Sequence, residues 1–107
     1  MTEKLLTEKQ VKIKVVGYLR KQGWEVFTVY LGGIPTGLGM LASNPLKGFP
    51  DLICTHSGQK EIMYVELKKT KGGKVSTEQL VWHARLRDCN QKVYVITSIE
   101  DLKKEGL

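Results

Sequence analysis

Two carboxylates and one lysine are spaced so that neighbouring strands would bring them together. Asp51 begins the segment DLICT, and Glu66 and Lys68 lie in the segment EIMYVELK. The turn residues between these segments predict an antiparallel hairpin. The numbers of its paired residues sum to roughly 116 or 117, so Asp51 lies opposite or nearly opposite Glu66. Because strand side chains alternate, Lys68 shares a face with Glu66, which places two carboxylates and an ammonium group at one end of a sheet.

This combination is typical of metal-assisted attack on a phosphate. Hard divalent cations such as Mg²⁺ bind one or two protein carboxylates together with phosphate oxygens of the substrate. A nearby lysine orients or deprotonates the attacking water and stabilises the charge that builds on the phosphate. Structural roles stay open beside this one. Asp51 would then be an ordinary residue that starts a strand after proline, and Glu66 and Lys68 a solvated pair on an exposed sheet face.

The sequence predicts one α/β domain over residues 1–107, and its helices and strands would position these residues. Residues 7–22 carry apolar side chains at helical spacing, begin with the capping-box pair Thr7 and Gln10, and end before Gly23. The following segments predict, in order, a strand over 24–30, a loop over 31–48, strands over 51–55 and 61–68, a helix over 77–89, a strand over 92–97 and a short helix ending at Lys104. The glycine-rich loop is predicted to be mobile and to face the substrate.

The composition favours an anionic partner in a reducing compartment. Lys and Arg number 17 against 11 Asp and Glu, which gives a net charge of +6. Charge alone leaves nucleic acid and an anionic membrane surface both open. No run of about 18 apolar residues is present, so no membrane-spanning helix is expected. The charged start MTEKLLTEKQ lacks the apolar core of a signal peptide, and the two cysteines are expected as free thiols.

The residues around the acidic cluster resemble a nuclease family. Pro50 and Asp51, followed by Glu66, Leu67 and Lys68, are similar to the PD-(D/E)xK nuclease motif. A first helix that begins with TE and ends at glycine, and then the blocks GFPDL, VELK and STEQ, resemble the VRR-Nuc domain, the virus-type replication-repair nuclease. The resemblance covers residues 7–102. It implies an α/β, restriction-endonuclease-like fold with αβββαβ order, a central mixed sheet flanked by helices and a short C-terminal helix.

The resemblance also implies roles for individual residues. Asp51 and Glu66 are expected to bind Mg²⁺ or Mn²⁺ together with the backbone carbonyl of Leu67, and Lys68 is expected to be the catalytic lysine. The reaction implied is hydrolysis of phosphodiester bonds in DNA.

Two further site residues are expected from the same resemblance, and each has a structural alternative. Glu8, on the first helix, is expected as an additional ligand or a water-mediated contact, but an acidic residue in a first turn also complements the helix dipole. Gln79 is expected as a catalytic residue at the edge of the site, but it also completes a capping box with Ser76.

Basic residues beside the motif predict contacts with the DNA backbone. Lys69, Lys71 and Lys74 follow the proposed catalytic strand around two glycines, and Arg85 lies on the next helix. Neutralising phosphates in this way provides most of the affinity for a duplex. The alternative is that these residues form a solvated loop.

A zinc site is not expected, because the cysteines and histidines do not have the spacing of zinc ligands. His56 and His83 are predicted as surface or rim residues.

The resemblance to the short, stand-alone domains of this family implies a homodimer that nicks four-way junctions. The sequence is therefore expected to encode a homodimeric nuclease selective for branched DNA, similar to a Holliday junction resolvase, in the cytoplasm of a bacterial or phage-infected cell. A nuclease without junction selectivity has the same chemistry and stays open. A non-catalytic nucleic-acid-binding module is the other alternative, although such a module would gain nothing from buried like charges.

Overall fold

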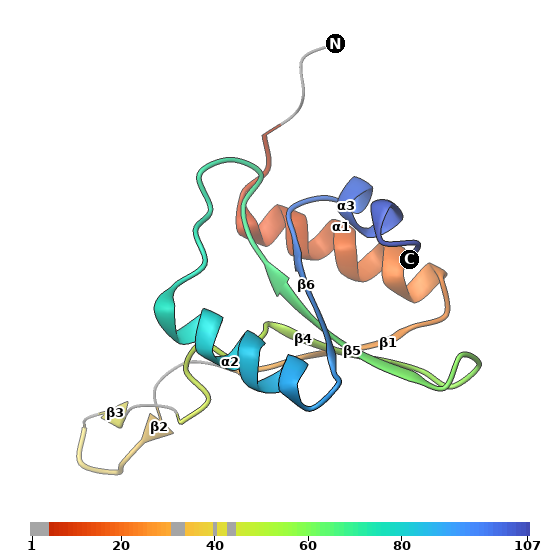
Figure 1. The fold of residues 1–107 in the computed structure, drawn as a ribbon. Coiled ribbons are helices and arrows are strands. Elements are labelled where there is room, and N and C mark those ends of the chain that lie inside the picture. Colours follow the sequence, from red (N-terminus) through yellow and green to blue (C-terminus); the bar gives the residue numbers. More distant parts are fainter. Residues whose placement is uncertain (1–4, 31–33, 40, 43–44) are drawn as a thin grey trace.

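The computed structural model describes residues 5–30, 34–39, 41–42 and 45–107, which form a four-stranded sheet with helices on both faces (Figure 1). The strands of the sheet, in spatial order, are β1 (Glu25–Thr28), β4 (Leu52–His56), β5 (Glu61–Leu67) and β6 (Lys92–Ile96). β1 and β5 run antiparallel to β4, whereas β6 runs parallel to β5. The sheet is therefore mixed, as predicted.

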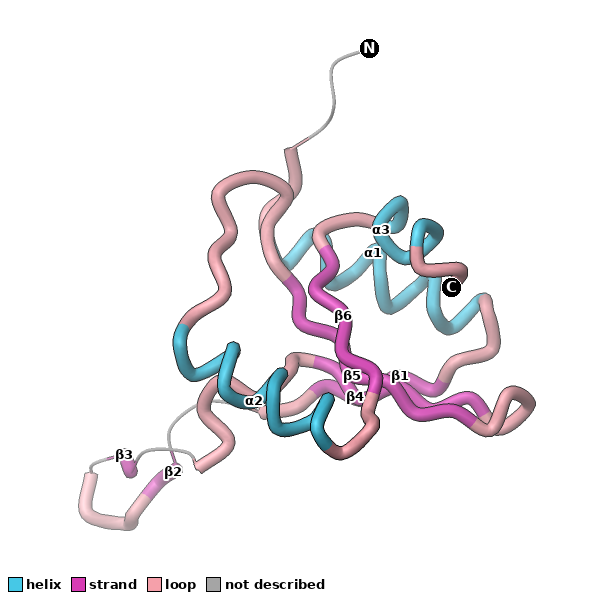
Figure 2. Tube along the Cα trace, in the orientation of Figure 1, coloured by secondary structure: helices cyan, strands magenta, loops and turns pink. Residues whose placement is uncertain are grey.

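The described helices cover both faces of this sheet. α1 (Glu8–Lys21) and α3 (Ile99–Lys104) lie together on one face, and α2 (Thr77–Asp88) lies on the other (Figures 1 and 2). α2 forms the crossover that a parallel pair such as β5 and β6 requires. The predicted α/β fold with a short C-terminal helix is confirmed, and it is compatible with a restriction-endonuclease-like core.

The main core lies between the sheet and α1. Val11, Val15 and Leu19 repeat at intervals of four residues along α1, and each is at most 1% exposed. Their partners on β5 are the alternate buried residues Met63, Val65 and Leu67. Burial of each such side chain contributes roughly 1.5–3 kcal/mol, so this contact fixes α1 against the hairpin.

Several elements end one or two residues from their predicted ends. Thr7 and Gln22 are the caps of α1 and not part of it, and Cys89 is the C-cap of α2. β1 ends at Thr28 and β5 at Leu67, and beyond each end a single backbone hydrogen bond still joins the next residue to the neighbouring strand. The capping box of Thr7 with Gln10, which marks the start of α1, is present as predicted.

Part of the segment predicted as a loop over 31–48 is a short ladder. β2 (Ile34–Pro35) pairs antiparallel with β3 (Leu41–Ala42), and Gly37 and Gly39, both with positive φ, lie in the bend between them. The prediction of an uninterrupted loop was wrong because two-residue strands leave no periodic pattern. Residues 31–33, 40 and 43–44 lie outside the described residues, so the mobility and substrate-facing position of this loop stay predictions.

Both cysteines are free thiols, as expected. Cys54 is buried and Cys89 is exposed. Burial raises the pKa of Cys54 to about 12, so this thiol is a core residue with little nucleophilic character. Among the described helices, none is long and apolar enough to span a bilayer.

Candidate active site

The hairpin of β4 and β5 has the register that the sequence predicts. Leu52 pairs with Val65 and Ile53 with Tyr64. Continuing this register by one residue places Asp51, which directly precedes β4, across from Glu66. The two carboxylates therefore come from adjacent strands at the same end of the sheet.

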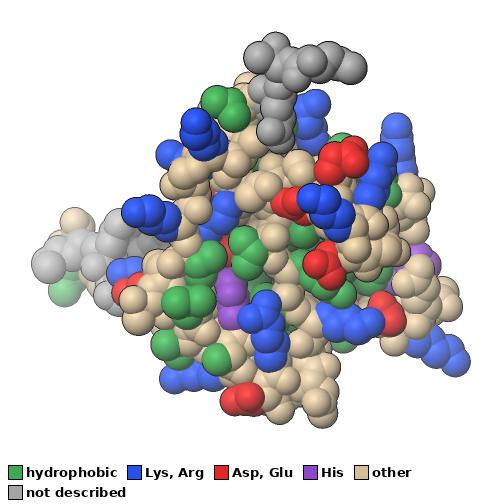
Figure 3. All heavy atoms as spheres, turned by 45° about the horizontal axis from the view of Figure 1, so that its top comes forward, with side chains coloured by type: hydrophobic (Ala, Val, Ile, Leu, Met, Phe, Trp, Pro, Cys, Tyr) green, Lys and Arg blue, Asp and Glu red, His purple; other side chains and the backbone are tan. Residues whose placement is uncertain are grey.

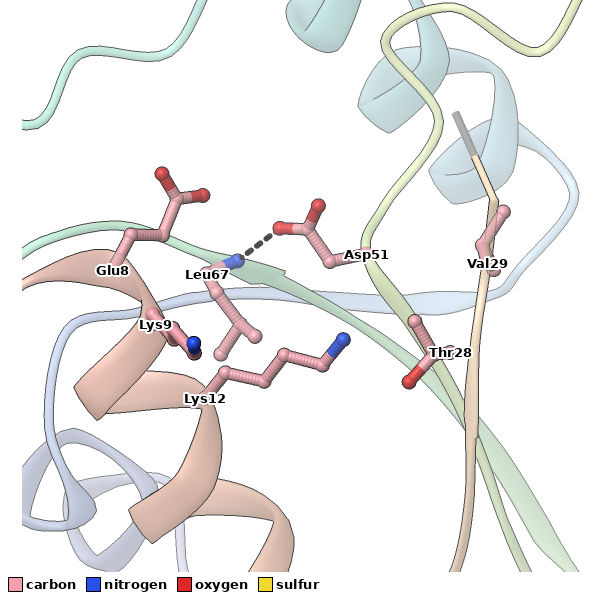
Figure 4. Close-up of a pocket in the computed structure, with 7 residues that line it drawn as sticks. All are labelled: Glu8, Lys9, Lys12, Thr28, Val29, Asp51 and Leu67. Carbon is pink, nitrogen blue, oxygen red and sulfur yellow. Dashed lines mark hydrogen bonds between the residues drawn. The ribbon is translucent and has the colours of Figure 1, made fainter. Parts of the chain in front are cut away.

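Asp51 is fixed by hydrogen bonds to the strands on both sides of it. Its side-chain Oδ2 accepts from the backbone N–H of Leu67 at 2.8 Å (Figure 4), and its carbonyl oxygen accepts from the N–H of Val29 at 2.8 Å. Pro50, immediately before it, is buried. The carboxylate of Asp51 is therefore anchored to β5. An ordinary residue at the start of a strand would make the backbone bond to Val29 but not the side-chain bond to Leu67.

Glu66 is a wholly buried carboxylate with one oxygen left over. Its exposed fraction is 0%, its Oε1 lies 3.3 Å from Nε2 of His83, and its Oε2 has no hydrogen-bond partner among the described residues. Burial, and next the adjacent carboxyl of Asp51, raise the pKa of Glu66 to about 9, while Lys68 acts in the opposite direction. The alternative of a solvated pair on an open sheet face is excluded for Glu66.

His83 is the site residue that the sequence interpretation missed. It was expected at the surface or rim, but it is 2% exposed and contacts Glu66. Its pKa is lowered by burial and then by the nearby charges of Arg87 and Lys68, so the imidazole is neutral. The structure places His83 four residues after the half-buried Gln79, on the same face of α2, but the burial of that face is not visible in the sequence.

Lys68 lies next to these groups although it is past the end of β5. Its backbone N–H donates to the carbonyl oxygen of Ile96 at 3.1 Å, which extends the parallel pairing with β6 by one residue. Its half-buried side chain is close enough to affect the pKa of both Glu66 and His83. The predicted triad of two carboxylates and a lysine is therefore assembled in one place.

A cavity of about 350 Å³ opens in front of Asp51 (Figure 4). In Figure 4, the side chains of Glu8 and Asp51 extend to the same side of Leu67, from α1 and from the start of β4. The complete lining is Glu8, Lys9, Lys12, Thr28, Val29, Asp51 and Leu67. The structure thus brings Glu8 to the same cavity as Asp51, as expected, with Lys9 and Lys12 as basic neighbours.

Gln79 has a structural contact in this fold. Its Oε1 accepts from the N–H of Ser76 at 2.8 Å, and its own N–H donates to Ser76 Oγ at 3.2 Å, which completes the capping box of α2. Gln79 does not line the cavity beside Asp51. Its catalytic role stays a prediction.

The predicted DNA-binding side chains are exposed and lie outside that cavity. Lys69, Lys71 and Lys74 lie in the loop between β5 and α2, and Arg85 lies over the ring of Trp82 at 5.3 Å. On the face drawn in Figure 3, Lys and Arg side chains are dispersed among acidic ones and form no single continuous patch. The roles of these four residues stay predictions.

The donor set fits a hard divalent cation bound by few protein ligands. Asp51 and Glu66 offer carboxylate oxygens, and Oε2 of Glu66 is a buried acceptor that needs a partner. In the part of the chain that the structure describes, no three His, Cys, Asp or Glu side chains form a complete ligand group. Mg²⁺ takes one or two protein carboxylates and completes its shell with water and phosphate oxygens, so two carboxylates are a sufficient protein ligand set for this ion.

A mixed sheet with two carboxylates and a lysine at the end of its central hairpin defines a nuclease-type α/β domain. The model of the VRR-NUC domain family matches residues 42–100, which is more than half of the chain, and the protein belongs to this family. No curated protein and no solved structure matches it. Family membership makes this a nuclease-type protein with DNA as substrate. The matched region contains Asp51, Glu66 and Lys68, whereas Glu8 joins the site through the fold.

Proposed function

We propose that the protein is a metal-dependent endodeoxyribonuclease that uses Mg²⁺ or Mn²⁺ and selects branched DNA, including four-way junctions. The observation that carries the metal dependence is Glu66. It is a wholly buried carboxylate with an unpartnered oxygen, next to Asp51 and Lys68. With a pKa of about 9 this group holds a proton at neutral pH in the absence of a cation, and a cation bound beside Asp51 would replace that proton.

In this proposal each group has a separate task. Asp51 and Glu66 hold the cation together with the backbone carbonyl of Leu67, and Glu8 contacts it directly or through water. A cation bound there would lower the pKa of a coordinated water and balance charge on the phosphate. The ammonium group of Lys68 orients the attacking water and stabilises the oxygens of the scissile phosphate. Lys69, Lys71, Lys74 and Arg85 bind the neighbouring backbone.

We propose a homodimer because of the symmetry of a four-way junction. Symmetrical cutting of a four-way junction needs two active sites related by a two-fold axis, and one chain of 107 residues with one motif provides one site. A closed two-fold dimer is the simplest assembly that meets this requirement. The proposed setting is the cytoplasm of a bacterial or phage-infected cell, where the two thiols would stay reduced.

The proposal is tested by cleavage of a labelled four-way junction and its matched linear duplex, each with Mg²⁺, Mn²⁺ or EDTA. Paired nicks in the junction alone, and only with a cation, support it in full. Equal cutting of the duplex would keep the nuclease and remove the junction selectivity. Binding of DNA without any cutting in either metal would favour the non-catalytic module.

Cation binding is expected to be visible in thermal stability without any DNA. At a cation concentration about 100 times Kd, stabilisation is about 2.7 kcal/mol, which raises Tm by roughly 10 °C or more for a domain of this size. Glu66→Gln and Asp51→Asn are expected to remove this rise. The measurement is Tm against Mg²⁺ and Mn²⁺ concentration, with Na⁺ at equal ionic strength as the control.

The same experiment in EDTA has a definite dependence on pH. Because the folded state raises the pKa of Glu66 from 4.5 to about 9, it holds a proton that the unfolded chain releases over this range. Stability in EDTA therefore falls as pH rises from about 4.5 towards 9. Glu66→Gln should flatten this part of the curve, and an equal slope in the variant would contradict the assignment.

His83 is expected to position Glu66 for the cation. Its Nε2 lies 3.3 Å from Oε1 of this buried carboxyl group. His83→Phe is expected to weaken cation affinity about 10- to 100-fold, as measured by the Tm titration, whereas His83→Gln, which keeps a donor, should retain most of it. Equal losses in both variants would show that the ring contributes only packing.

A further inference from the structure

A trough along α1 leads away from Asp51 and Glu8. Beside the cavity in front of Asp51 lies a second one, of about 390 Å³. Its lining is Lys12, Ile13, Val16, Gly17, Arg20 and Thr28. Lys12 and Thr28 line both cavities, so the two hollows meet at these side chains. We call the combined depression, bounded by α1 and β1, the α1 trough.

The α1 trough becomes more basic away from Asp51. At its inner end the carboxylates of Glu8 and Asp51 are balanced by Lys9 and Lys12, whereas no acidic residue lines the outer cavity. Lys12 stands at the junction, and Figure 4 shows its side chain crossing the inner cavity with the amino group directed between Asp51 and Thr28. Arg20 lies at the far end, with Nη2 3.5 Å from the carbonyl oxygen of Val26.

We propose that the α1 trough binds the phosphodiester backbone of the DNA strand adjacent to the scissile phosphate. This inference rests on the proposed nuclease function and adds a binding surface to it. The trough follows α1 from Glu8 to Arg20, about 18 Å, which is the rise of about five nucleotides of a B-form strand. Lys9, Lys12 and Arg20 supply the cations that backbone phosphates require.

The α1 trough is separate from the basic loop after β5. Lys69, Lys71 and Lys74 line neither of its two cavities. The N-terminal end of α1 is joined to that loop, because the N–H of Leu6 donates to Thr70 Oγ1 at 3.0 Å. The loop therefore contacts the chain next to the Glu8 end of the trough, whereas Arg20 lies at the opposite end. The strand that carries the scissile phosphate is held by the trough, and the rest of the DNA by the loop.

The decisive comparison is between two lysines of one helix. Lys12→Ala removes a cation from the trough. Lys14→Ala removes the same charge from an exposed position that lines neither of the two cavities. Lys14 lines a third cavity, which extends from Ile13 and Gly17 towards α3 and away from Asp51. Affinity for a labelled linear duplex is measured in EDTA over a series of salt concentrations, so that no cleavage interferes. Lys12→Ala is expected to weaken binding about 3- to 10-fold and to reduce the salt slope by about 0.9. Lys14→Ala should change affinity less than about twofold, and Lys12→Arg should restore it.

The outcomes separate this inference from the proposed function. Equal effects of Lys12→Ala and Lys14→Ala would overturn the trough while leaving the nuclease unaffected. DNA affinity could fall in Lys12→Ala but not in Lys14→Ala, while the unsubstituted protein cuts no DNA with Mg²⁺ or Mn²⁺. This result would support the trough as a binding surface and reject the proposed nuclease activity. A specific loss together with metal-dependent cleavage supports both.

Discussion

Asp51→Asn is expected to lower the rate of DNA cleavage by about 1,000-fold or more while the fold and DNA binding persist. Asparagine has the shape of aspartate and keeps an oxygen that accepts from the N–H of Leu67, a bond of 2.8 Å in the native chain. The change removes the negative charge that a divalent cation requires of its ligand. A loss of this size corresponds to about 4 kcal/mol of transition-state stabilisation. It is measured as the single-turnover rate at saturating protein.

Two control variants separate cleavage from binding. Asp88→Asn makes the same substitution at the exposed last residue of α2 and should leave the rate unchanged. The double variant Lys71→Ala with Lys74→Ala should have the reverse phenotype of Asp51→Asn. It should bind DNA less tightly, more so at high salt, and retain its rate once saturated. Parallel losses of binding and rate in all of these variants would contradict the separate roles.

The register of the catalytic hairpin could be predicted from sequence because two constraints agree. The turn near residue 58 fixes which residues pair, and the apolar alternation of Met63 and Val65 fixes which face is buried. Asp51 and Glu66 follow from this register without knowledge of the rest of the fold. The start of α1 could be predicted for a similar reason, because its capping box involves only the neighbouring residues Thr7 and Gln10.

Burial at the site could not be predicted in the same way. A strand with alternating side chains leaves open whether its polar face meets solvent or a helix. For Glu66 the answer depends on α2, which begins eleven residues later and brings His83 onto that face. The histidine was missed because its contact joins residues 17 positions apart, and a single histidine in a helix has no local pattern that indicates a carboxylate partner.

The α1 trough depends on tertiary structure for the same reason. Lys12 and Lys14 are indistinguishable in the sequence, where both read as solvated charges off the apolar stripe. Packing of α1 against β1 places Lys12 beside Thr28 and leaves Lys14 out of both cavities. Which lysine can contact substrate therefore follows from the rotation of the helix against the sheet, and that rotation is set by Val11, Val15 and Leu19.

Gly48→Ala is expected to destabilise the protein by about 2–4 kcal/mol and to reduce cleavage, although residue 48 has no side chain to contribute. Gly48 has a φ of +87°, and a Cβ there would lie 2.5 Å from the carbonyl carbon of Glu78, in the first turn of α2. These atoms belong to the backbone, which cannot move aside as the end of a long side chain can. Either α2 or the segment that leads to Asp51 must therefore shift. Urea denaturation measures the loss of stability, and the single-turnover assay measures the displacement of the site.

Gly37→Ala separates the two causes of this loss of stability, which are backbone strain at positive φ and contact of the new Cβ with α2. Gly37 has a similar φ of +83°, but a Cβ there would meet nothing within 4 Å, so its substitution costs only the backbone strain, about 1 kcal/mol. The excess loss in Gly48→Ala then measures the close approach of the two segments. Equal losses would mean that this approach does not constrain the site. A larger loss of stability in Gly48→Ala than in Gly37→Ala, together with a reduced cleavage rate, would show that the contact between α2 and the segment before Asp51 positions the site. His83 lies on α2 and Asp51 follows Gly48, so this contact sets the position of one group relative to the other.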